Sequence, residues 1–136
     1  MVRHATSADA ARVGELASQW GYVVTQDRVV ATLAVPSTSL AVFEHEGQVQ
    51  GWIELRITYA MESGERAEIV GLVVDQAARR KGVGKHLVDF ARGWAREKGI
   101  QTLLVRSRKS RVEAHAFYPA VGFEVVKEQT VFQARL

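Results

Sequence analysis

Apolar residues recur every three or four positions in the first part of the chain, which is the spacing of one face of a helix. The pattern predicts a first helix from Thr6 to about Gly21, with Asp9 three residues after Thr6 as a variant of the capping box. Its inward positions are Ala10, Val13, Leu16, Ala17 and Trp20. A second, shorter helix is predicted over residues 27–35, because Pro36 cannot continue it.

Runs with strand-like composition dominate the middle of the chain. A short strand over residues 2–6 opens the sequence, and residues 39–57 read as two strands joined by a hairpin turn at Gly47. Residues 64–74 form a further strand, whose apolar run stops at Val74.

Helical spacing returns from Gly82 to about Lys98. The inward positions of this helix are Val83, Leu87, Phe90, Ala91 and Trp94. After Gly99 the pattern predicts a strand over residues 101–107, a helix over 112–121, and two short strands within 123–136.

These elements predict an α/β fold in one domain over residues 1–136. The strand, helix and strand from Glu68 to Ser107 make one parallel βαβ unit, while the first half is antiparallel. The expected architecture is therefore a mixed, mostly antiparallel sheet with helices on both faces.

Composition excludes several classes of protein. With no cysteine, disulfides, thiolate catalysis and cysteine zinc sites are excluded, and the four histidines lack ligand spacing, so no metal is expected. A net charge of +3 is too small to indicate a nucleic-acid-binding protein by itself. The sequence shows neither a signal peptide nor an apolar stretch of 18 residues, so a cytoplasmic location is expected.

A basic, glycine-containing turn follows the strand that ends at Val74. A strand that leads through such a turn into a helix makes an anion site, because the helix N-terminus presents unsatisfied N–H groups. The spacing excludes a Walker A loop, since Arg79 stands at its first glycine, and a Rossmann turn, since Leu87 stands at its third. A phosphate or pyrophosphate fits the turn, and its members are Arg79, Arg80, Lys81, Gly82, Gly84 and Lys85.

The turn resembles the acyl-CoA pyrophosphate turn of the GNAT superfamily of N-acetyltransferases, whose pattern [RQ]-x-x-G-x-[GA] is matched by Arg79, Gly82 and Gly84. A second GNAT signature, A-x-x-F-Y-x-x-x-G-F, is matched further along the chain by Ala114, Phe117, Tyr118, Gly122 and Phe123. Two positions depart from the family pattern: Gln76 replaces a common proline and Arg111 a common asparagine.

The resemblance implies a GNAT-like fold, acetyl-CoA as co-substrate, and transfer of an acetyl group to a primary amine of a small molecule or protein. It places the acyl-CoA on Leu72, Val73, Val74, Arg79, Arg80, Lys81, Gly82, Val83, Gly84 and Lys85. In the family the strand before the turn splays from its neighbour, and the pantetheine arm pairs with the exposed backbone. A homodimer is compatible with this fold, and no membrane partner is expected.

Amine acylation requires a base, because an alkyl amine with a pKa of about 10.4 is protonated at pH 7. Glu68 is the first candidate, since strict strand alternation places it on one face with Val70, Leu72 and Val74, where burial would raise its pKa. The competing interpretation is an ion pair with Arg56 or Arg66.

Other residues complete the predicted site. Glu54 on the neighbouring strand is the second candidate base, and His115 is a third. The resemblance assigns Tyr118 as the acid that protonates the leaving thiolate. An N–H near Val73 or Val74 would stabilise the carbonyl oxygen. Gly71 marks a bulge or a site where another backbone approaches, and the competing interpretation is a glycine that accommodates a bulky neighbour.

Two alternative functions stay open at the level of sequence. One is a non-catalytic acyl-CoA-binding module, and the other is a nucleic-acid-binding module built on the basic residues, although no aromatic stacking motif accompanies them. The identity of the amine also stays open. Aromatic residues that could contact it are Trp20, Tyr22, Trp52 and Tyr59, which at this spacing equally fit a core.

Overall fold

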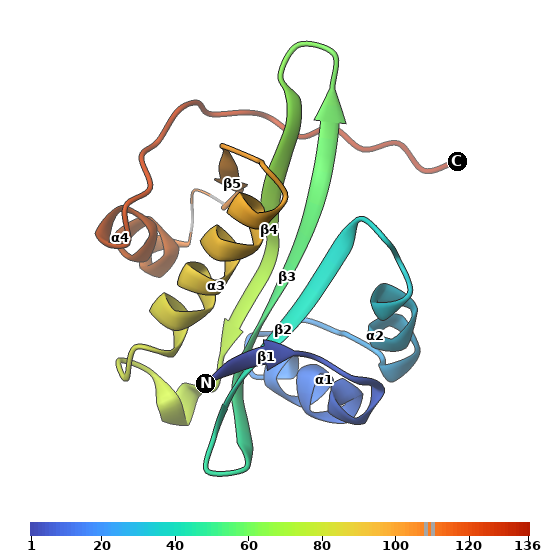
Figure 1. Ribbon diagram of the computed structural model, residues 1–136, viewed down its shortest axis with the longest axis vertical. Coiled ribbons are helices and arrows are strands. Elements are labelled where there is room, and N and C mark those ends of the chain that lie inside the picture. The colour runs from blue at the N-terminus through green and yellow to red at the C-terminus, as the bar shows by residue number, and fades with distance from the viewer. Residues whose placement is uncertain (108, 110) are drawn as a thin grey trace. The chain divides into compact units, whose positions relative to one another are not determined.

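The structure, a computed structural model, describes residues 1–107, 109 and 111–136 (Figure 1). The chain divides into two compact units, Met1–Arg106 and Ser107–Leu136. The expectation of a single domain over the whole chain stays a prediction.

A five-stranded sheet in the order β1-β2-β3-β4-β5 forms the centre of the first unit. Strands β1 to β4 pair antiparallel in sequence order, and β5 pairs parallel with β4. The strands are β1 (Val2–His4), β2 (Thr38–His45), β3 (Gln48–Ala60), β4 (Gly64–Val74) and β5 (Leu103–Val105). The predicted mixed, mostly antiparallel sheet is therefore confirmed.

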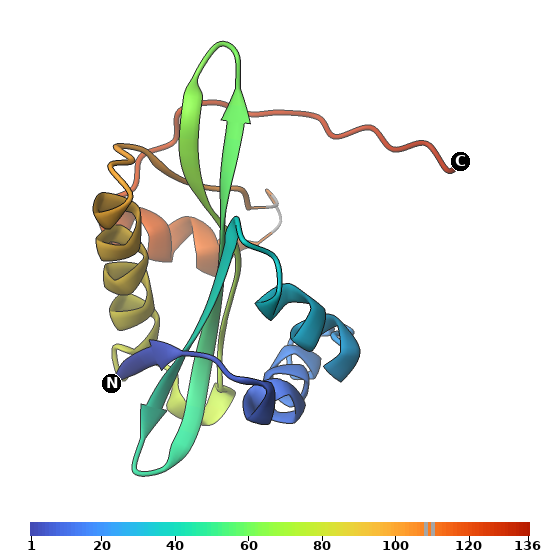
Figure 2. The ribbon, with the colours of Figure 1, turned by 45° about the vertical axis from the view of Figure 1, so that its right-hand side comes forward.

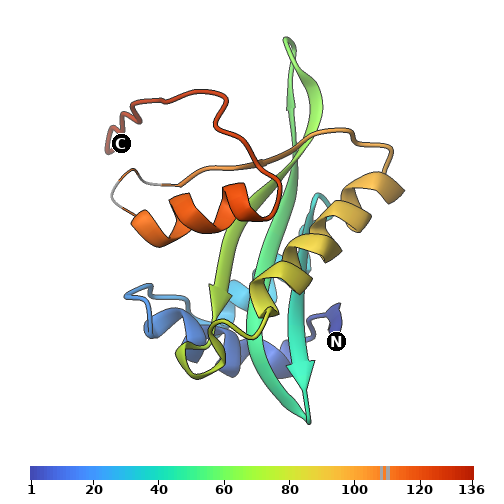
Figure 3. The same cartoon turned by 90° about the vertical axis from the view of Figure 1, so that its left-hand side faces the viewer.

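Helices cover both faces of this sheet, as predicted. Figure 2 shows α1 and α2 on one side of the strands and α3 on the other, and Figure 3 shows α3 in front of the sheet. The helices are α1 (Ala10–Ser18), α2 (Gln26–Leu33) and α3 (Val83–Glu97), with short 3-10 turns η1 (Ser7–Asp9) and η2 (Gln76–Ala78). Among the described residues, no helix is long and apolar enough to cross a membrane.

Local sequence signals explain where these elements begin and turn. The Thr6 N–H donates to Asp9 Oδ2 at 2.8 Å, which is the capping contact expected from their spacing. Glu46 and Gly47 have φ angles of 51° and 76°, as a two-residue hairpin turn between β2 and β3 requires.

The sheet separates two apolar cores. Under α1 and α2 lie Leu40, Val42, Trp52 and Val73, which pack against Val13 and Leu16 of α1 among others. Residues buried on α3 are Val83, Leu87, Val88, Ala91, Trp94 and Ala95. Phe90, expected inward, is only partly buried, and its ring meets the ring of His4 edge-on.

The second unit contains α4 (Val112–Ala120). The helix closes through Gly122, whose φ is 97°, and the Phe123 N–H donates to the Tyr118 carbonyl at 3.0 Å. The prediction of two strands within residues 123–136 is wrong for this structure, which assigns neither helix nor strand to these described residues. Their apolar side chains, such as Phe132, are exposed, and a strand forms only where another backbone pairs with it.

Strand β4 contains one residue more than the stretch of β3 that it pairs with. Glu54 pairs with Gly71, but the next residue, Leu55, pairs with Ile69, so Val70 is left over as a β-bulge. Gly71 beside it has no room for a side chain, because a Cβ there would lie 3.0 Å from Cζ3 of Trp52. Two sequence interpretations of Gly71 therefore hold: a bulge lies at the adjacent Val70, and the glycine accommodates a bulky neighbour.

Gly71→Ala is expected to destabilise the fold. The Trp52 ring cannot easily move away, because it is buried and its Nε1 donates to the Val13 carbonyl at 3.1 Å. Overpacking of this kind costs about 1–3 kcal/mol, which urea unfolding would measure as a lower free energy of unfolding. The matched control is Gly93→Ala in α3, where the new Cβ meets nothing within 4 Å and helix propensity predicts a gain of up to about 1 kcal/mol. Equal stability of the Gly71 variant and the wild type would contradict this packing.

Candidate active site

Strands β4 and β5 pair with each other over only part of β4. Pairing with β5 covers Ala67 to Ile69, whereas β4 continues to Val74 with β3 still beside it. The part of β4 from the bulge to Val74 therefore lies beyond its last β5 partner. We call this part of β4 the splayed segment, after the strand separation that the GNAT resemblance implies before the basic turn.

The prediction that Glu68 shares a face with Leu72 and Val74 is wrong, because it did not include the bulge. Strict alternation would put Glu68 on one face with Leu72 and Val74, but the extra residue Val70 reverses the phase of everything after it. Directly paired residues share a face, and Glu68 pairs with Arg56. Glu68 therefore lies on the α1 and α2 face.

Backbone groups of β4 point alternately toward β3 and toward the open edge. The Asp75 N–H donates to the Gln50 carbonyl at 2.8 Å, so by alternation the polar groups of Val73 face β3, and those of Leu72 and Val74 face away from it. Of the two expected oxyanion donors, the N–H of Val73 faces β3 and is excluded, whereas the N–H of Val74 remains a candidate. The N–H of Leu72, which also faces away from β3, is a further candidate. Sequence reasoning missed this because it could not place the bulge.

The basic turn has the backbone of an anion-binding loop. Arg80 and Gly82 adopt left-handed φ angles of 63° and 81°, and Gly82 directly precedes α3. Its four basic side chains, Arg79, Arg80, Lys81 and Lys85, are all exposed. A turn with left-handed residues, a helix N-terminus and exposed cations suits a pyrophosphate, so the residues present fit the diphosphate of CoA.

Glu68 is buried between two arginines. Its exposed fraction is 4%, its Oε2 accepts a hydrogen bond from Arg56 at 2.8 Å, and its Oε1 accepts one from Arg106. The predicted ion pair with Arg56 is confirmed, but the second partner is Arg106 rather than Arg66. No local pattern could have revealed Arg106, which lies 38 positions further along the chain.

Glu54 occupies a different environment on the same face. It stands opposite Gly71, beside the bulge, and is partly buried. Removal from water raises the pKa of this carboxyl, and the positive charge of Arg56 offsets only part of the effect. Glu54 therefore combines a raised pKa with a position at the start of the splayed segment, which is what a general base needs.

Tyr118 belongs to the second unit. Its ring packs edge-on against Phe117 and Phe123, with centroid separations of 5.1 and 5.5 Å. Burial raises the pKa of Tyr118 to about 12, while the charge of Arg111 acts in the opposite direction. The phenol is therefore protonated throughout the neutral and mildly alkaline range, as a proton donor must be.

The other predicted residues are dispersed. Trp52 belongs to the core, Tyr59 is exposed near the end of β3, and Trp20 donates its Nε1 hydrogen to the Val74 carbonyl at 3.0 Å. His115 lies exposed on α4. Within the described part of the chain, no group of three or more potential metal ligands comes together.

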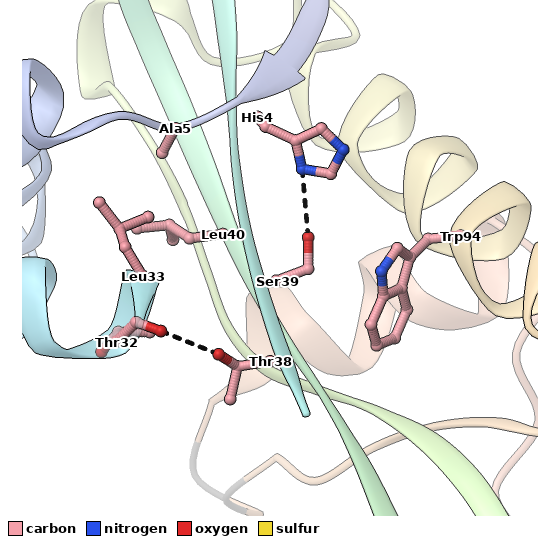
Figure 4. A pocket seen from close by; sticks show the side chains of 8 residues that line it. All are labelled: His4, Ala5, Thr32, Leu33, Thr38, Ser39, Leu40 and Trp94. Atoms are coloured by element: carbon pink, nitrogen blue, oxygen red, sulfur yellow. Dashed lines mark hydrogen bonds between the residues drawn. The ribbon is translucent and has the colours of Figure 1, made fainter. Parts of the chain in front are cut away.

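A hollow of about 300 Å³ lies elsewhere on the first unit, between the start of β2 and the end of α3 (Figure 4). In Figure 4, Thr38 bonds to Thr32 on one side of β2, while Ser39 and His4 face Trp94 on the other. The strand register separates this hollow from the splayed segment, because Thr38 pairs with Arg56 whereas Val74 pairs with Gly51. The hollow is not part of the candidate site.

Comparison with known proteins decides the family. The model of the acetyltransferase (GNAT) family matches residues 11–123, which include the splayed strand, the basic turn and Tyr118. The chain belongs to the GNAT family. It is an N-acetyltransferase by family, and the co-substrate of that family is acetyl-CoA.

Similar proteins include enzymes that act on aminoglycosides. An aminoglycoside N(6')-acetyltransferase type 1 from Stenotrophomonas maltophilia is 28% identical over 142 residues, covering 99% of this chain and 93% of its own. One from Klebsiella aerogenes is 33% identical over 107 residues, covering 76% and 70%. The solved structure of an aminoglycoside N-acetyltransferase with CoA has a TM-score of 0.86 at 17% identity and covers 100% of both chains, which shows the shared fold.

Gly82→Val is expected to weaken CoA binding roughly tenfold or more, because a β-branched residue strongly resists a left-handed φ. The cost is conformational, since the nearest atom to a Cβ at this position is His86 Cδ2, 4.0 Å away. Gly82→Asn is the matched variant: asparagine tolerates the left-handed region, so it should keep more of the affinity. Isothermal calorimetry with CoA measures both, and equal affinity of Gly82→Val and wild type would exclude the turn from the site.

Proposed function

We propose that this GNAT protein transfers the acetyl group of acetyl-CoA by direct attack of a primary amine on the thioester. The observation that carries the proposal is the splayed end of β4, which leads directly into a turn with two left-handed residues and a helix N-terminus. Acetyl-CoA supplies the activated acetyl group. Leu72, Val74 and the turn would hold it through backbone N–H groups, and the basic side chains would balance its phosphate charge.

The acceptor we propose to test first is an aminoglycoside, because two similar curated proteins carry that activity in their names. Polyamines, amino acids and protein amines are the other classes that the chemistry admits. The cytoplasmic location and the homodimer stay predictions.

Glu54 is better supported than Glu68 as the base that takes the amine proton. A base must be able to accept a proton near neutral pH, and desolvation moves the pKa of Glu54 toward that range. Each oxygen of Glu68, by contrast, already accepts a hydrogen bond from an arginine. Glu68 is retained as the alternative base.

Tyr118 is proposed as the acid that protonates the leaving thiolate. The family resemblance supports its place beside the sulfur, and its raised pKa supports its protonated state. Arg111, whose charge is felt by Tyr118, would favour the negative charge that develops there.

A thiol-release assay with acetyl-CoA and a panel of amines tests the function. The proposed acceptor class would be supported if an aminoglycoside causes release of CoA and if mass spectrometry shows that its 6'-amine has been acetylated. Turnover with another amine would move the proposal to that class. Binding of CoA without turnover on any amine would instead favour the non-catalytic acyl-CoA-binding module.

Removing the charge of Glu54 and removing the charge of Glu68 should change the stability of the protein in opposite directions. Glu54→Gln is expected to lower kcat/KM by about 10²- to 10⁴-fold at pH 7. It should also stabilise the protein at that pH. Because burial raises the folded-state pKa, the stability contributed by Glu54 is present at low pH and is lost as the pH rises through that pKa, a loss that neutral glutamine avoids.

Glu68→Gln is the matched comparison, in which the loss of charge leaves Arg56 and Arg106 facing a neutral amide. It should lower the thermal unfolding midpoint at pH 7, whereas Glu54→Gln should raise it. Steady-state kinetics and thermal melts measure both variants. A Glu68→Gln enzyme with the larger loss of kcat, partly restored at high pH where more amine is neutral, would assign the base to Glu68 and reject Glu54.

Tyr118→Phe keeps the ring contacts of the second unit and removes only the phenolic proton. The turnover number should fall by about 10²- to 10⁴-fold, with CoA affinity nearly unchanged. Steady-state kinetics and calorimetry provide the two numbers. A decrease of less than roughly threefold would remove Tyr118 from the mechanism, given the usual contribution of an acid–base step.

A further inference from the structure

The end of α1 is tied to the segment that leaves β4. The backbone N–H of Gln76 donates to Gln19 Oε1 at 2.9 Å, and Gln76 Nε2 donates to the Gln19 carbonyl at 3.2 Å. Each glutamine thus uses its side chain on the backbone of the other. Such a reciprocal pair fixes both segments, because rotation of either side chain breaks a backbone bond.

Asp75 extends this connection through three further hydrogen bonds. Its Oδ1 accepts from Gln19 Nε2 at 3.2 Å and from the Ala77 N–H at 3.0 Å, so one carboxylate oxygen caps η2 and contacts α1. Its Oδ2 accepts from Arg12 at 2.8 Å. The Ala77 bond, followed by those from Gln19 and Arg12, lowers the pKa of Asp75, which keeps the acceptor charged.

Trp20, which follows Gln19 in the sequence, contacts the same segment. Its Nε1 donates to the carbonyl of Val74 at 3.0 Å, on the edge that faces away from β3. The guanidinium of Arg79 lies over the Trp20 ring, 5.2 Å from its centroid. Contacts from the end of α1 therefore span the chain from the splayed strand to the first residue of the basic turn.

We propose that Gln19 is a positioning residue for CoA. Its hydrogen bonds go to Asp75 and Gln76, which lie between the predicted CoA-binding residues Val74 and Arg79, and they hold this connecting segment against the end of α1. The role rests on the proposed function, since it concerns the site that binds acetyl-CoA. It predicts that losing the Gln19 side chain weakens CoA binding with little change in the chemical step.

A substitution at position 76 would also remove hydrogen bonds between Gln19 and the segment after β4. Position 76 is the first residue of η2, and the preceding Asp75 has φ −52° and ψ 129°, a conformation that a following proline accepts. Gln76→Pro therefore removes both bonds to Gln19 without straining the chain. The Gln19–Asp75 bond remains in this variant, so the two substitutions share part of their effect.

The experiment compares wild type, Gln19→Ala, Gln76→Pro and the double variant, with Gln101→Ala, an exposed glutamine before β5, as control. Calorimetry should give CoA dissociation constants raised roughly tenfold by Gln19→Ala, with KM for acetyl-CoA rising in step and kcat within about twofold. In the Gln76→Pro background, Gln19→Ala should have a smaller effect, since one of the two side-chain bonds that it removes is already lost. The control should match wild type.

Hydrogen exchange in the protein without CoA separates this role from the proposed function. Gln19→Ala should raise the exchange rate of the Gln76 and Ala77 amides, whatever the protein binds. Unchanged exchange, unchanged CoA affinity, or a loss confined to kcat would each overturn the positioning role. Wild type that fails to bind CoA would overturn the proposed function and this role with it, and the exchange rates would still report whether Gln19 holds the segment.

Discussion

One inserted residue, Val70, sets the geometry on which the candidate site depends. From Ala67 to Ile69, β4 lies between two partner strands, and after the bulge it pairs only with β3 in the first unit. A bulge bends and twists its strand, so the separation of β4 from β5 begins where the register shifts. The insertion also decides which backbone groups face the open edge, because it reverses the alternation of the residues that follow. Without it, Leu72 and Val74 would present their polar groups to β3.

Two carboxylates lie on the same face of the sheet near the bulge, in opposite environments. Glu68, before the bulge, is fully enclosed and neutralised by Arg56 and Arg106, so it links β3, β4 and the residue that follows β5 at the point where the strands separate. Glu54, beside the bulge, is partly desolvated, and the charge of Arg56 offsets only part of the resulting rise in its pKa. A paired buried carboxylate is typical of structural support, and an incompletely compensated one is typical of chemistry. The same face thus contains a residue suited to each task.

Much of this fold follows from local sequence signals, and the site follows less completely. The capping pair Thr6 and Asp9, the hairpin at Gly47 and the helix after Gly82 were predictable because each depends on residues within a few positions. The position of the bulge was not, because the run from Ile69 to Val74 is apolar in either phase and alternation therefore carries no information there. Arg106 escaped prediction for a related reason: strand pairing, not sequence proximity, brings it to Glu68.

The stability of the first unit and its proposed chemistry make conflicting demands at one position. Glu54 lies between Trp52 and Arg56 on β3, opposite a glycine, where an apolar or amide side chain would avoid the cost of a partly desolvated charge. The fold accommodates that cost because the surrounding contacts are strong: Trp52 is anchored to α1, and α1 is bonded in turn to the end of β4. A rigid frame around an unfavourable charge is what keeps a base from relaxing into an ion pair. The hydrogen bonds of Gln19 and Trp20 therefore belong to the same arrangement as the proposed base, since they hold the end of β4 against which, in the proposed mechanism, the amine and the thioester would meet.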